Sequence, residues 1–309
     1  MVQVFIDGKE GTTGLRIFDR LAGRKDIALL TLKEEQRKER SARKEMLNSC
    51  DIAFLCLPDA AAQEAVALIE NERTRVIDAS TAHRTLPGWQ YGFPELFENG
   101  FAKVKNAPRV AVPGCHASGF IALIYPLIQA GFLEKDALLT CHSLTGYSGG
   151  GKKMIAEYDA DKRSRLLDAP RQYGITQQHK HLKEMQAVCG LQNAPVFCPI
   201  VAPFYSGMLV TVPLFAKQLK KGGIEDIRRL YTAQYGGPLV RYSENSDEAG
   251  FLSSNARQGS DAMEISVFGN EERLLLTARY DNLGKGASGA AIECMNIMLG
   301  CDPLTGLEI

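Results

Sequence analysis

An α/β fold is predicted, with an N-terminal Rossmann-type doubly wound parallel sheet and a second α+β catalytic domain carrying a mixed or antiparallel sheet. Up to about residue 115, short β-branched and aromatic runs alternate with helical patterns. A glycine-rich turn follows the first run, at Gly8–Gly14, and precedes a helical pattern. After residue 130, several strand patterns follow one another with few helices between them. These three observations carry the fold prediction.

The composition limits the possible partners and the cellular location. The 309 residues have a net charge of zero, so no nucleic-acid or anionic-membrane partner is expected. The longest apolar stretch, Phe120–Phe132, is too short to span a bilayer. The eight cysteines are scattered without CxxC or Cys/His ligand spacing, so no metal is expected. Scattered thiols without a secretory signal favour a cytoplasmic protein.

The first element with a chemical role is the turn after the strand expected at Val2–Ile6. Gly8, Gly11 and Gly14 follow a GxxGxxG spacing, with Thr12 and Thr13 between the last two glycines. In a strand–turn–helix context, such a loop brings backbone N–H groups and a helix N-terminus to a pyrophosphate. A tight turn without a ligand is the alternative. The favoured interpretation is a dinucleotide site.

The second strand, expected at Ile27–Leu32, bears on the choice of cofactor. NAD sites usually have an acidic residue near this point, which binds the ribose 2′-hydroxyl. The chain instead has Thr31, Leu32 and Lys33 here, which favours NADP(H). Lys33 and Arg37 are weak candidates for the 2′-phosphate, because a charged run is more often a solvated helix face.

Three further strands are expected over Asp51–Leu57, Arg75–Asp78 and Arg109–Val112, with a helix over Ala60–Glu70. Ligands of doubly wound sheets bind at the carboxyl ends of the strands. Arg84 follows the second of these strands and can bind a phosphate or carboxylate with two parallel hydrogen bonds. A surface ion pair is the alternative role for this residue.

Cys115 stands where a strand meets a helix. Pro113-Gly114 ends the strand, and apolar residues recur at helical spacing over Ala117–Gln129. A cysteine on the first helical turn faces unpaired N–H groups and the positive end of the dipole, which favours the nucleophilic thiolate. The same N–H groups can stabilise an oxyanion. A buried cysteine without chemistry is the alternative.

The glycine-rich loop Thr145–Lys153 and a histidine pair follow. The loop contains Lys152 and can line an anion site, although a flexible loop without a ligand is an equal alternative. His179 and His181 fall in a segment expected to begin a helix near Gln177. Residues two apart on a helix do not face one another, which disfavours joint metal ligation. Either histidine can act as acid and base beside a reactive cysteine, or be structural.

The remaining elements complete the second domain. Helices are expected at Ile224–Tyr235 and Ala287–Leu299, and the second of these can return to pack on the first domain. Strands are expected at Val196–Pro203, Gly207–Phe215, Met263–Gly269 and Arg273–Tyr280.

The sequence resembles the N-acetyl-γ-glutamyl-phosphate reductases in their shorter, type 2 form, which are relatives of aspartate-semialdehyde dehydrogenase. The likeness covers nearly the whole chain in order, and VPGCHASG is its most specific motif. His116, Lys152 and Lys183 depart from the usual residues of the family. The segments that carry the resemblance are GKEGTTG (Gly8–Gly14), YGFPEL (Tyr91–Leu96), VPGCHASG (Val112–Gly119), Gly146–Lys153, Gln178–Met185 and DNLGKG (Asp281–Gly286).

The resemblance implies a function and roles for residues. The reaction would be NADPH-dependent reduction of N-acetyl-γ-glutamyl phosphate to the 5-semialdehyde and phosphate, through a cysteine thioacyl intermediate, in arginine biosynthesis. Cys115 would be the nucleophile, His179 the general acid and base with His181 as support, and Asn282 a nicotinamide contact. The turn residues Gly8, Gly11, Thr12, Thr13 and Gly14 would bind the cofactor, and Arg84 and Lys152 the substrate.

The implied organisation is an NADP-binding domain at 1–114 plus 286–309 and a catalytic domain at 115–285, which would also form a homo-oligomer, a dimer or a tetramer. Three alternatives stay open. The substrate can be a related acyl phosphate, aspartyl or aminoadipyl. The protein can be an NADP-dependent reductase without a covalent step, or a non-catalytic NADP sensor.

Overall fold

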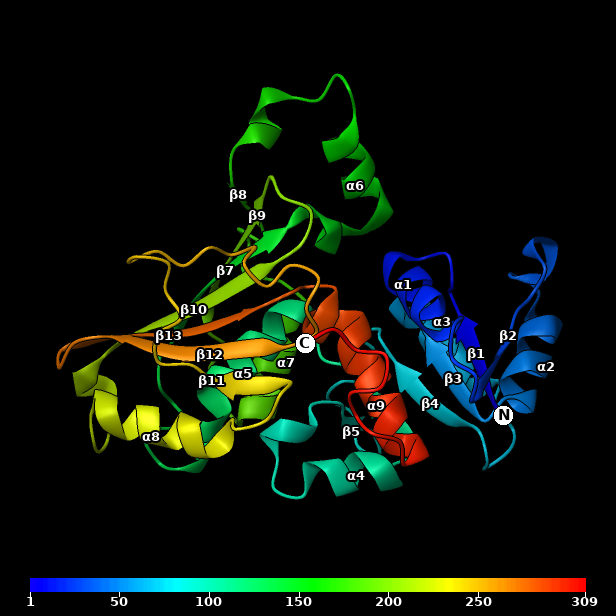
Figure 1. Cartoon of the computed structure of the whole chain (residues 1–309), viewed down its shortest axis with the longest axis horizontal. Helices are drawn as coiled ribbons and strands as arrows, with labels where there is room; N and C mark the ends of the chain where they lie inside the picture. Colours follow the sequence, from blue (N-terminus) through cyan, green and yellow to red (C-terminus); the bar gives the residue numbers. More distant parts are fainter. The chain divides into compact units, whose positions relative to one another are not determined.

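The computed structural model describes all 309 residues and divides into two compact units (Figure 1). Compared with the expected catalytic domain, 115–285, unit 2 additionally contains Gly114, Gly286, the short segment Glu95–Glu98 and the last two residues. None of the helices combines the length and the apolar character that a membrane span requires. Unit 1 comprises Met1–Pro94, Asn99–Pro113 and Ala287–Leu307, and unit 2 comprises Glu95–Glu98, Gly114–Gly286 and Glu308–Ile309.

Unit 1 is built on a six-stranded sheet in the order β2-β1-β3-β4-β6-β5, and every pairing is parallel. The predicted doubly wound sheet is therefore confirmed. Its strands are β1 (Val2–Asp7), β2 (Ile27–Leu30), β3 (Ile52–Leu55), β4 (Arg75–Asp78), β5 (Gln90–Tyr91) and β6 (Arg109–Ala111).

Helices cover both faces of this sheet. Successive strand residues point to opposite faces, so Val4 and Ile6 pack in one apolar cluster while Phe5 packs in another. The first cluster is covered by α1, α4 and α9, and the second by α2 and α3. The C-terminal helix therefore packs on the N-terminal sheet. The helices are α1 (Thr12–Leu21), α2 (Arg40–Ser49), α3 (Asp59–Ala67), α4 (Gly100–Asn106) and α9 (Gly289–Leu299).

Unit 2 contains a seven-stranded sheet in the order β11-β12-β13-β10-β7-β9-β8. The β11–β12 and β7–β9 pairs are parallel and the others are antiparallel, which confirms the predicted mixed sheet. The strands are β7 (Thr140–Gly146), β8 (Arg171–Gln172), β9 (Val196–Ala202), β10 (Met208–Phe215), β11 (Val240–Tyr242), β12 (Met263–Gly269) and β13 (Arg273–Tyr280).

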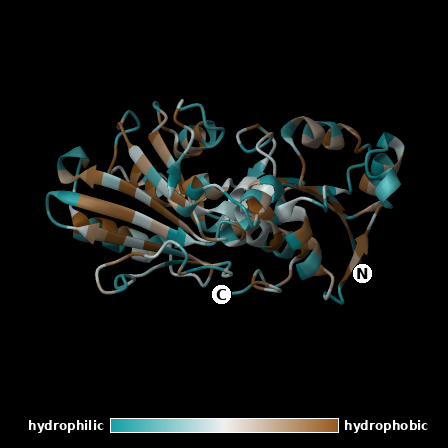
Figure 2. Cartoon of the chain, turned by 90° about the horizontal axis from the view of Figure 1, so that it is seen from above, coloured by the Kyte–Doolittle hydropathy of each residue, from teal (hydrophilic) through white to brown (hydrophobic).

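Only one face of this sheet is covered by helices. Along β10 the side chains alternate between buried and half-exposed, and α5 and α8 pack on the buried face. Figure 2 shows hydrophobic and paler residues alternating along these strands. The helices of unit 2 are α5 (Cys115–Gln129), α6 (Gly151–Asp159), α7 (His181–Cys189) and α8 (Ile224–Gln234).

Several short elements were not predicted from the sequence. β5, β8 and β11 have two or three residues each, too few to show a period, and α4 is a single seven-residue helix. The remaining short elements are 3₁₀ turns at Glu34–Gln36, Pro94–Leu96, Tyr147–Gly150, Arg165–Asp168 and Ala216–Gln218, and a π-helical turn at Gly284–Ser288.

Candidate active site and cofactor pocket

Cys115 lies on the first turn of α5, as predicted; it is the first residue of the helix, and its side chain is partly exposed. Gly114 precedes it in an extended conformation. The N–H of Ser118 donates to the carbonyl of Gly114, so the N–H groups of His116 and Ala117 are left without acceptors inside the helix. The Cys115 sulfur therefore lies on a helical turn where unpaired N–H groups and the positive dipole end favour negative charge.

Two buried side chains that were not predicted as site residues hold this turn in place. A carboxylate oxygen of Glu184 accepts the N–H of Gly114 at 2.8 Å. The Tyr280 hydroxyl donates to the carbonyl of Cys115 and accepts the N–H of Gly119 at 3.0 Å. These partners come from α7 and β13, far from Cys115 in the sequence, so no local pattern could reveal them.

The two neighbouring histidines lie differently from the expectation. α7 begins only at His181, so His179 lies in the turn before the helix and their ring centroids are 4.8 Å apart. The expectation that the two rings do not face one another was wrong, because it assumed a helix through both. Nδ1 of His179 accepts the N–H of His181 at 3.2 Å, which leaves the proton of the neutral ring on Nε2. Burial, and then the charge of Lys180, lower the pKa of His179.

His116 occupies the centre of this cluster, although the sequence marked it only as a departure from the family. Its ring centroid is 5.8 Å from that of His179 and 5.6 Å from that of His181. Nδ1 lies 2.6 Å from the Ser143 hydroxyl, and Nε2 lies 2.6 Å from the Tyr173 hydroxyl. Burial, with a smaller contribution from His179, lowers the pKa of His116 to about 3. The imidazole therefore stays neutral at physiological pH.

Asn282 is buried, and both ends of its amide are engaged within unit 2. Its oxygen accepts the N–H of Gly207 at 2.9 Å, and its nitrogen donates to the Ser148 hydroxyl at 3.0 Å. The neighbouring Asp281 is fully buried and accepts hydrogen bonds from Ser206 and from backbone N–H groups, including that of Leu283. This pair ties the DNLGKG segment to the loops around it.

Arg84 and Lys152 occupy very different environments. In unit 1, Nε of Arg84 donates to the carbonyl of Val112 at 2.9 Å, and a terminal nitrogen donates to that of Ala79 at 3.2 Å. These bonds tie together the ends of β4 and β6. Lys152 is exposed on the first turn of α6 in unit 2.

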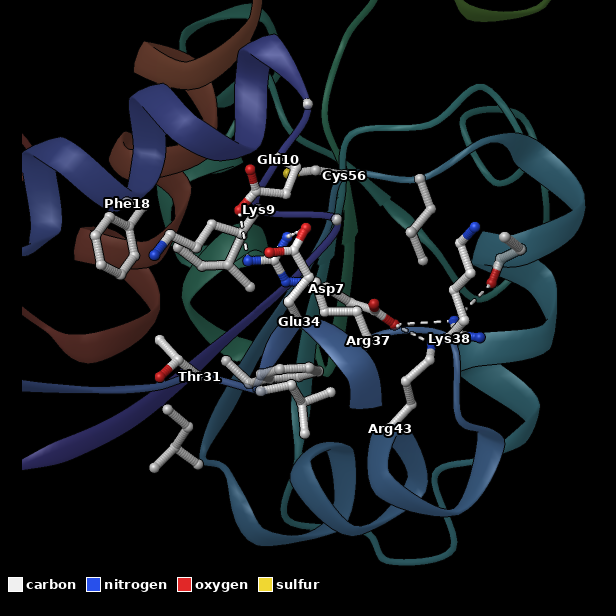
Figure 3. A pocket seen from close by; sticks show the side chains of 18 of the residues that line it. Asp7, Lys9, Glu10, Phe18, Thr31, Glu34, Arg37, Lys38, Arg43 and Cys56 are labelled. Atoms are coloured by element: carbon white, nitrogen blue, oxygen red, sulfur yellow. Dashed lines mark hydrogen bonds and ion pairs between the residues drawn. The ribbon is translucent and has the colours of Figure 1, made fainter.

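A pocket of about 800 Å³ opens in unit 1 beside the glycine-rich turn (Figure 3). It is formed by the turn after β1, the segment after β2 and the end of β3, which is where doubly wound folds hold dinucleotides. The pocket is lined by Phe5, Ile6, Asp7, Gly8, Lys9, Glu10, Gly11, Phe18, Leu30, Thr31, Leu32, Glu34, Glu35, Arg37, Lys38, Arg43, Cys56, Leu57, Pro58 and Ala61.

Glycine is favoured at each of the three positions of the turn for a different physical reason. Gly8 has φ +87°, and a Cβ there would lie 2.3 Å from the carbonyl oxygen of Cys56. A Cβ on Gly14 would lie 2.4 Å from the carbonyl oxygen of Gly8, so Gly14 lets the helix pack closely. A Cβ on Gly11 meets nothing closer than 3.4 Å in the protein. Packing therefore explains two glycines, while the third leaves backbone open toward a ligand.

The helix that begins after this turn fits a bound anion. Thr12 and Thr13 are its first two residues. The Thr12 hydroxyl oxygen is buried without a hydrogen-bond partner in the protein, an arrangement that a phosphate oxygen would satisfy. The turn, the orphaned hydroxyl and the pocket volume together fit a dinucleotide.

Basic side chains line the pocket near the end of β2. Arg37 lies 3.0 Å from Glu10 and 3.9 Å from Glu34, while Lys38 also lines the pocket. The alternative candidate Lys33 precedes a 3₁₀ turn, is exposed and is not among the lining residues. In Figure 3, Glu10 lies beside Lys9, while Arg37 and Lys38 are labelled nearer to Asp7 and Arg43.

Asp7 and Arg43 form a buried ion pair at 2.9 Å at the base of this pocket. Arg43 also lies 3.1 Å from Glu64 on α3. The Arg43 guanidinium therefore links α2 to β1 and α3, and these ion pairs within the protein use its hydrogen-bond donors.

Two protein-family models match the chain. Residues 30–104 match the semialdehyde dehydrogenase NAD-binding domain, and residues 115–282 match the semialdehyde dehydrogenase dimerisation domain. Both define the same class of protein, the semialdehyde dehydrogenases. Solved structures agree on the fold: aspartate semialdehyde dehydrogenase II of Vibrio cholerae has a TM-score of 0.71 at 15% identity, over 97% of this chain and 98% of that one. The NADP-bound enzyme of Candida albicans has a TM-score of 0.67 at 14% identity, over 97% and 98%.

Curated relatives identify the group of semialdehyde dehydrogenases to which the chain is similar in sequence. The N-acetyl-γ-glutamyl-phosphate reductase of Rhizobium meliloti is 45% identical over 96% of this chain and 98% of its own length. N-acetyl-γ-glutamyl-phosphate reductase 2 of a Nostoc species is 42% identical over 99% of both chains. The chain therefore belongs to the semialdehyde dehydrogenase family and, within it, to the N-acetyl-γ-glutamyl-phosphate reductases.

Proposed function

We propose that the chain reduces N-acetyl-γ-glutamyl phosphate to N-acetylglutamate 5-semialdehyde and phosphate with NADPH, in arginine biosynthesis. The observation that carries this proposal is the 45% identity, over almost the full length of both chains, to a relative that bears the name of this activity. The eight free thiols accord with a reducing cytoplasmic location.

Cys115 is the proposed nucleophile. Its thiolate forms a bond to the acyl carbon of the acyl phosphate, the carbonyl π electrons move to oxygen, and phosphate leaves as the carbonyl re-forms, giving a thioester. The N–H groups of His116 and Ala117 can stabilise the oxyanion, an effect of about 3 kcal/mol per donor.

His179 is the proposed acid and base, and His181 supports it. A lowered pKa keeps His179 neutral near pH 7. Its ring can take the proton of the Cys115 thiol at Nδ1 when the 3.2 Å bond from the N–H of His181 opens, and it can return a proton from Nε2. The bond from the N–H of His181 fixes the ring of His179 beside the start of α7.

NADP(H) is the proposed cofactor, held by Gly8, Gly11, Thr12, Thr13 and Gly14. When bound, a reduced nicotinamide supplies the hydride that converts a thioester to an aldehyde. Arg37 and Lys38 favour a 2′-phosphate at the ribose end, because Thr31 stands where an acidic residue would favour NAD.

Three further residues are proposed as contacts of the cofactor and the substrate. Asn282 would position the nicotinamide amide, although its own amide is already bonded at both ends. Arg84 and Lys152 would contact the phosphate or carboxylate of the substrate, and the exposed Lys152 has the freer side chain of the two.

A homo-oligomer is proposed through the helix-free face of the seven-stranded sheet. Apolar residues stay half-exposed or exposed across four adjacent strands of this face, which is unusual for a surface that faces only water. The face includes Leu144, Ile200, Leu209, Pro213 and Leu275.

The reverse reaction tests the activity. NADP reduction should depend on phosphate, and N-acetylglutamate semialdehyde should be preferred over aspartate and aminoadipate semialdehydes. Cys115→Ser should lower kcat by at least about 1,000-fold, while Cys301→Ser, at another partly exposed cysteine, should keep it. Intact mass spectrometry should detect the acyl group on the wild-type chain. Near-normal turnover of Cys115→Ser would refute the covalent mechanism.

A further inference from the structure

Three side chains from different elements of unit 2 form a hydrogen-bonded chain beside Cys115. Ser143 on β7 contacts Nδ1 of His116 on α5, and Nε2 of His116 contacts the hydroxyl of Tyr173, which follows β8. Both distances are 2.6 Å. A neutral imidazole has one donor and one acceptor nitrogen, so the chain can run in either of two directions.

The burial of Ser143 determines in which direction the hydrogen bonds of this chain are donated. This side chain is fully buried, and His116 is its hydrogen-bond partner in the structure. If Nδ1 carried the proton and donated to Ser143, the serine hydrogen would have no acceptor, which costs about 1–3 kcal/mol. Ser143 therefore donates to Nδ1, and Nε2–H of His116 donates to the oxygen of Tyr173.

The hydroxyl hydrogen of Tyr173 is consequently not used within the chain and can be donated to another group. The phenol lies in the neighbourhood of the reactive cysteine: its ring centroid is 5.9 Å from that of His179, and burial together with the Cys115 thiol raises its pKa. A phenol with a raised pKa keeps its hydrogen throughout the physiological pH range.

We propose that Tyr173 donates this hydrogen bond to the carbonyl oxygen of the acyl group at Cys115, and that His116 and Ser143 hold Tyr173 in the donor orientation. This inference rests on the thiolate chemistry proposed above. As the sulfur–carbon bond forms, the π electrons move to the carbonyl oxygen, and they return when the C–O bond to phosphate breaks. Tyr173 stabilises that charge without transferring its proton. Tyr173 is thus a catalytic residue, and His116 and Ser143 are positioning residues.

Nitrogen NMR of the imidazole rings tests the direction of the chain without any turnover. The protein has five histidines, and the His116 signals are those that His116→Gln removes. Protonated Nε2 and bare Nδ1 are expected, unchanged between about pH 5 and 8. Ser143→Ala should produce a mixture of the two neutral forms. A proton on Nδ1 in the wild type, or titration of His116 in this range, would overturn the proposed direction whatever the enzyme's activity.

Kinetics test the roles of the residues. Tyr173→Phe should lower kcat about 100-fold with KM changed less than about threefold, because the lost bond strengthens only as charge develops. His116→Phe should lower kcat about 10-fold. His116→Gln, whose amide can still donate to Tyr173, should recover part of the loss. With Tyr173→Phe already present, His116→Phe should have no further effect.

Each kinetic outcome has a separate meaning. Full kcat in Tyr173→Phe, with Cys115→Ser inactive, would overturn this inference and leave the proposed function standing. Additive losses in the double variant would overturn the positioning role of His116. Circular dichroism and thermal unfolding of every variant separate these effects from loss of fold.

Discussion

At the scale of single residues, burial decides the protonation state of His116. The ring is 3% exposed and has hydrogen-bond partners at both nitrogens, so it has no place for a second proton. Its pKa of about 3 lies well below the ordinary value of 6.5. Folding and protonation of this residue are therefore linked.

This linkage predicts a stability loss in mild acid. As pH falls below about 6.5, the unfolded chain gains a proton at His116 while the folded chain does not, until pH reaches about 3. Between pH 7 and 5 the free energy of unfolding should therefore fall by about 2 kcal/mol from His116 alone. Urea unfolding at both pH values should show a smaller fall for His116→Phe. The control His142→Gln, at an exposed histidine, should behave as the wild type. Equal falls in all three proteins would contradict the linkage.

At the scale of elements, α5 continues through a proline. Pro126 has no N–H, so the carbonyl of Ala122, four residues earlier, loses its helical donor. The buried Tyr235 hydroxyl donates to this carbonyl at 2.7 Å. Tyr235, the residue that caps the C-terminus of α8, thus supplies the hydrogen bond that α5 cannot make within itself, and α5 continues past the proline to Gln129.

The loss of stability caused by removing the Tyr235 hydroxyl should depend on the presence of Pro126. Tyr235→Phe should lower the free energy of unfolding by about 1–3 kcal/mol, because a buried carbonyl is left unpaired. With Pro126→Ala present, the loss should shrink, since an N–H is restored at position 126. The matched control is Tyr231→Phe. Tyr231 donates to the carbonyl of Leu123, which keeps the helical N–H of Leu127, so its loss should not depend on Pro126. Equal couplings for both tyrosines, measured by urea unfolding, would exclude this explanation.

At the scale of the whole molecule, the uncovered sheet face carries the proposed self-association. Leu275, the third residue of β13, is 43% exposed, although apolar strand residues are usually covered. The match of residues 115–282 to a dimerisation domain supports a second copy as the cover.

A charge on this face should therefore weaken the oligomer. Leu275→Glu should shift the mass measured by light scattering toward the monomer at micromolar concentrations, because an unpaired carboxylate would be buried between copies. Leu86→Glu, at a residue of unit 1 that is 41% exposed, should keep the wild-type mass. A wild-type monomer, or an unchanged oligomer in Leu275→Glu, would refute the proposed surface.

The features that follow local rules could be predicted from the amino-acid sequence alone. The glycine turn after β1, the place of Cys115 on the first turn of α5 and the strands Met263–Gly269 and Arg273–Tyr280 were predicted where they are found. Each depends on neighbours within a few residues, through backbone conformation, helix geometry or alternating burial. The alternation of strands and helices also predicted the class of both sheets.

The contacts between distant residues could be found only in the folded chain. The tertiary structure brings Glu184 to the N–H of Gly114, 70 positions away, and places Ser143 and Tyr173 on either side of His116. It also decided that α7 begins at His181, so that His179 turns toward its neighbour. These contacts follow from strand order, register and burial, which depend on the packing of the whole chain and leave no periodic signal in the sequence.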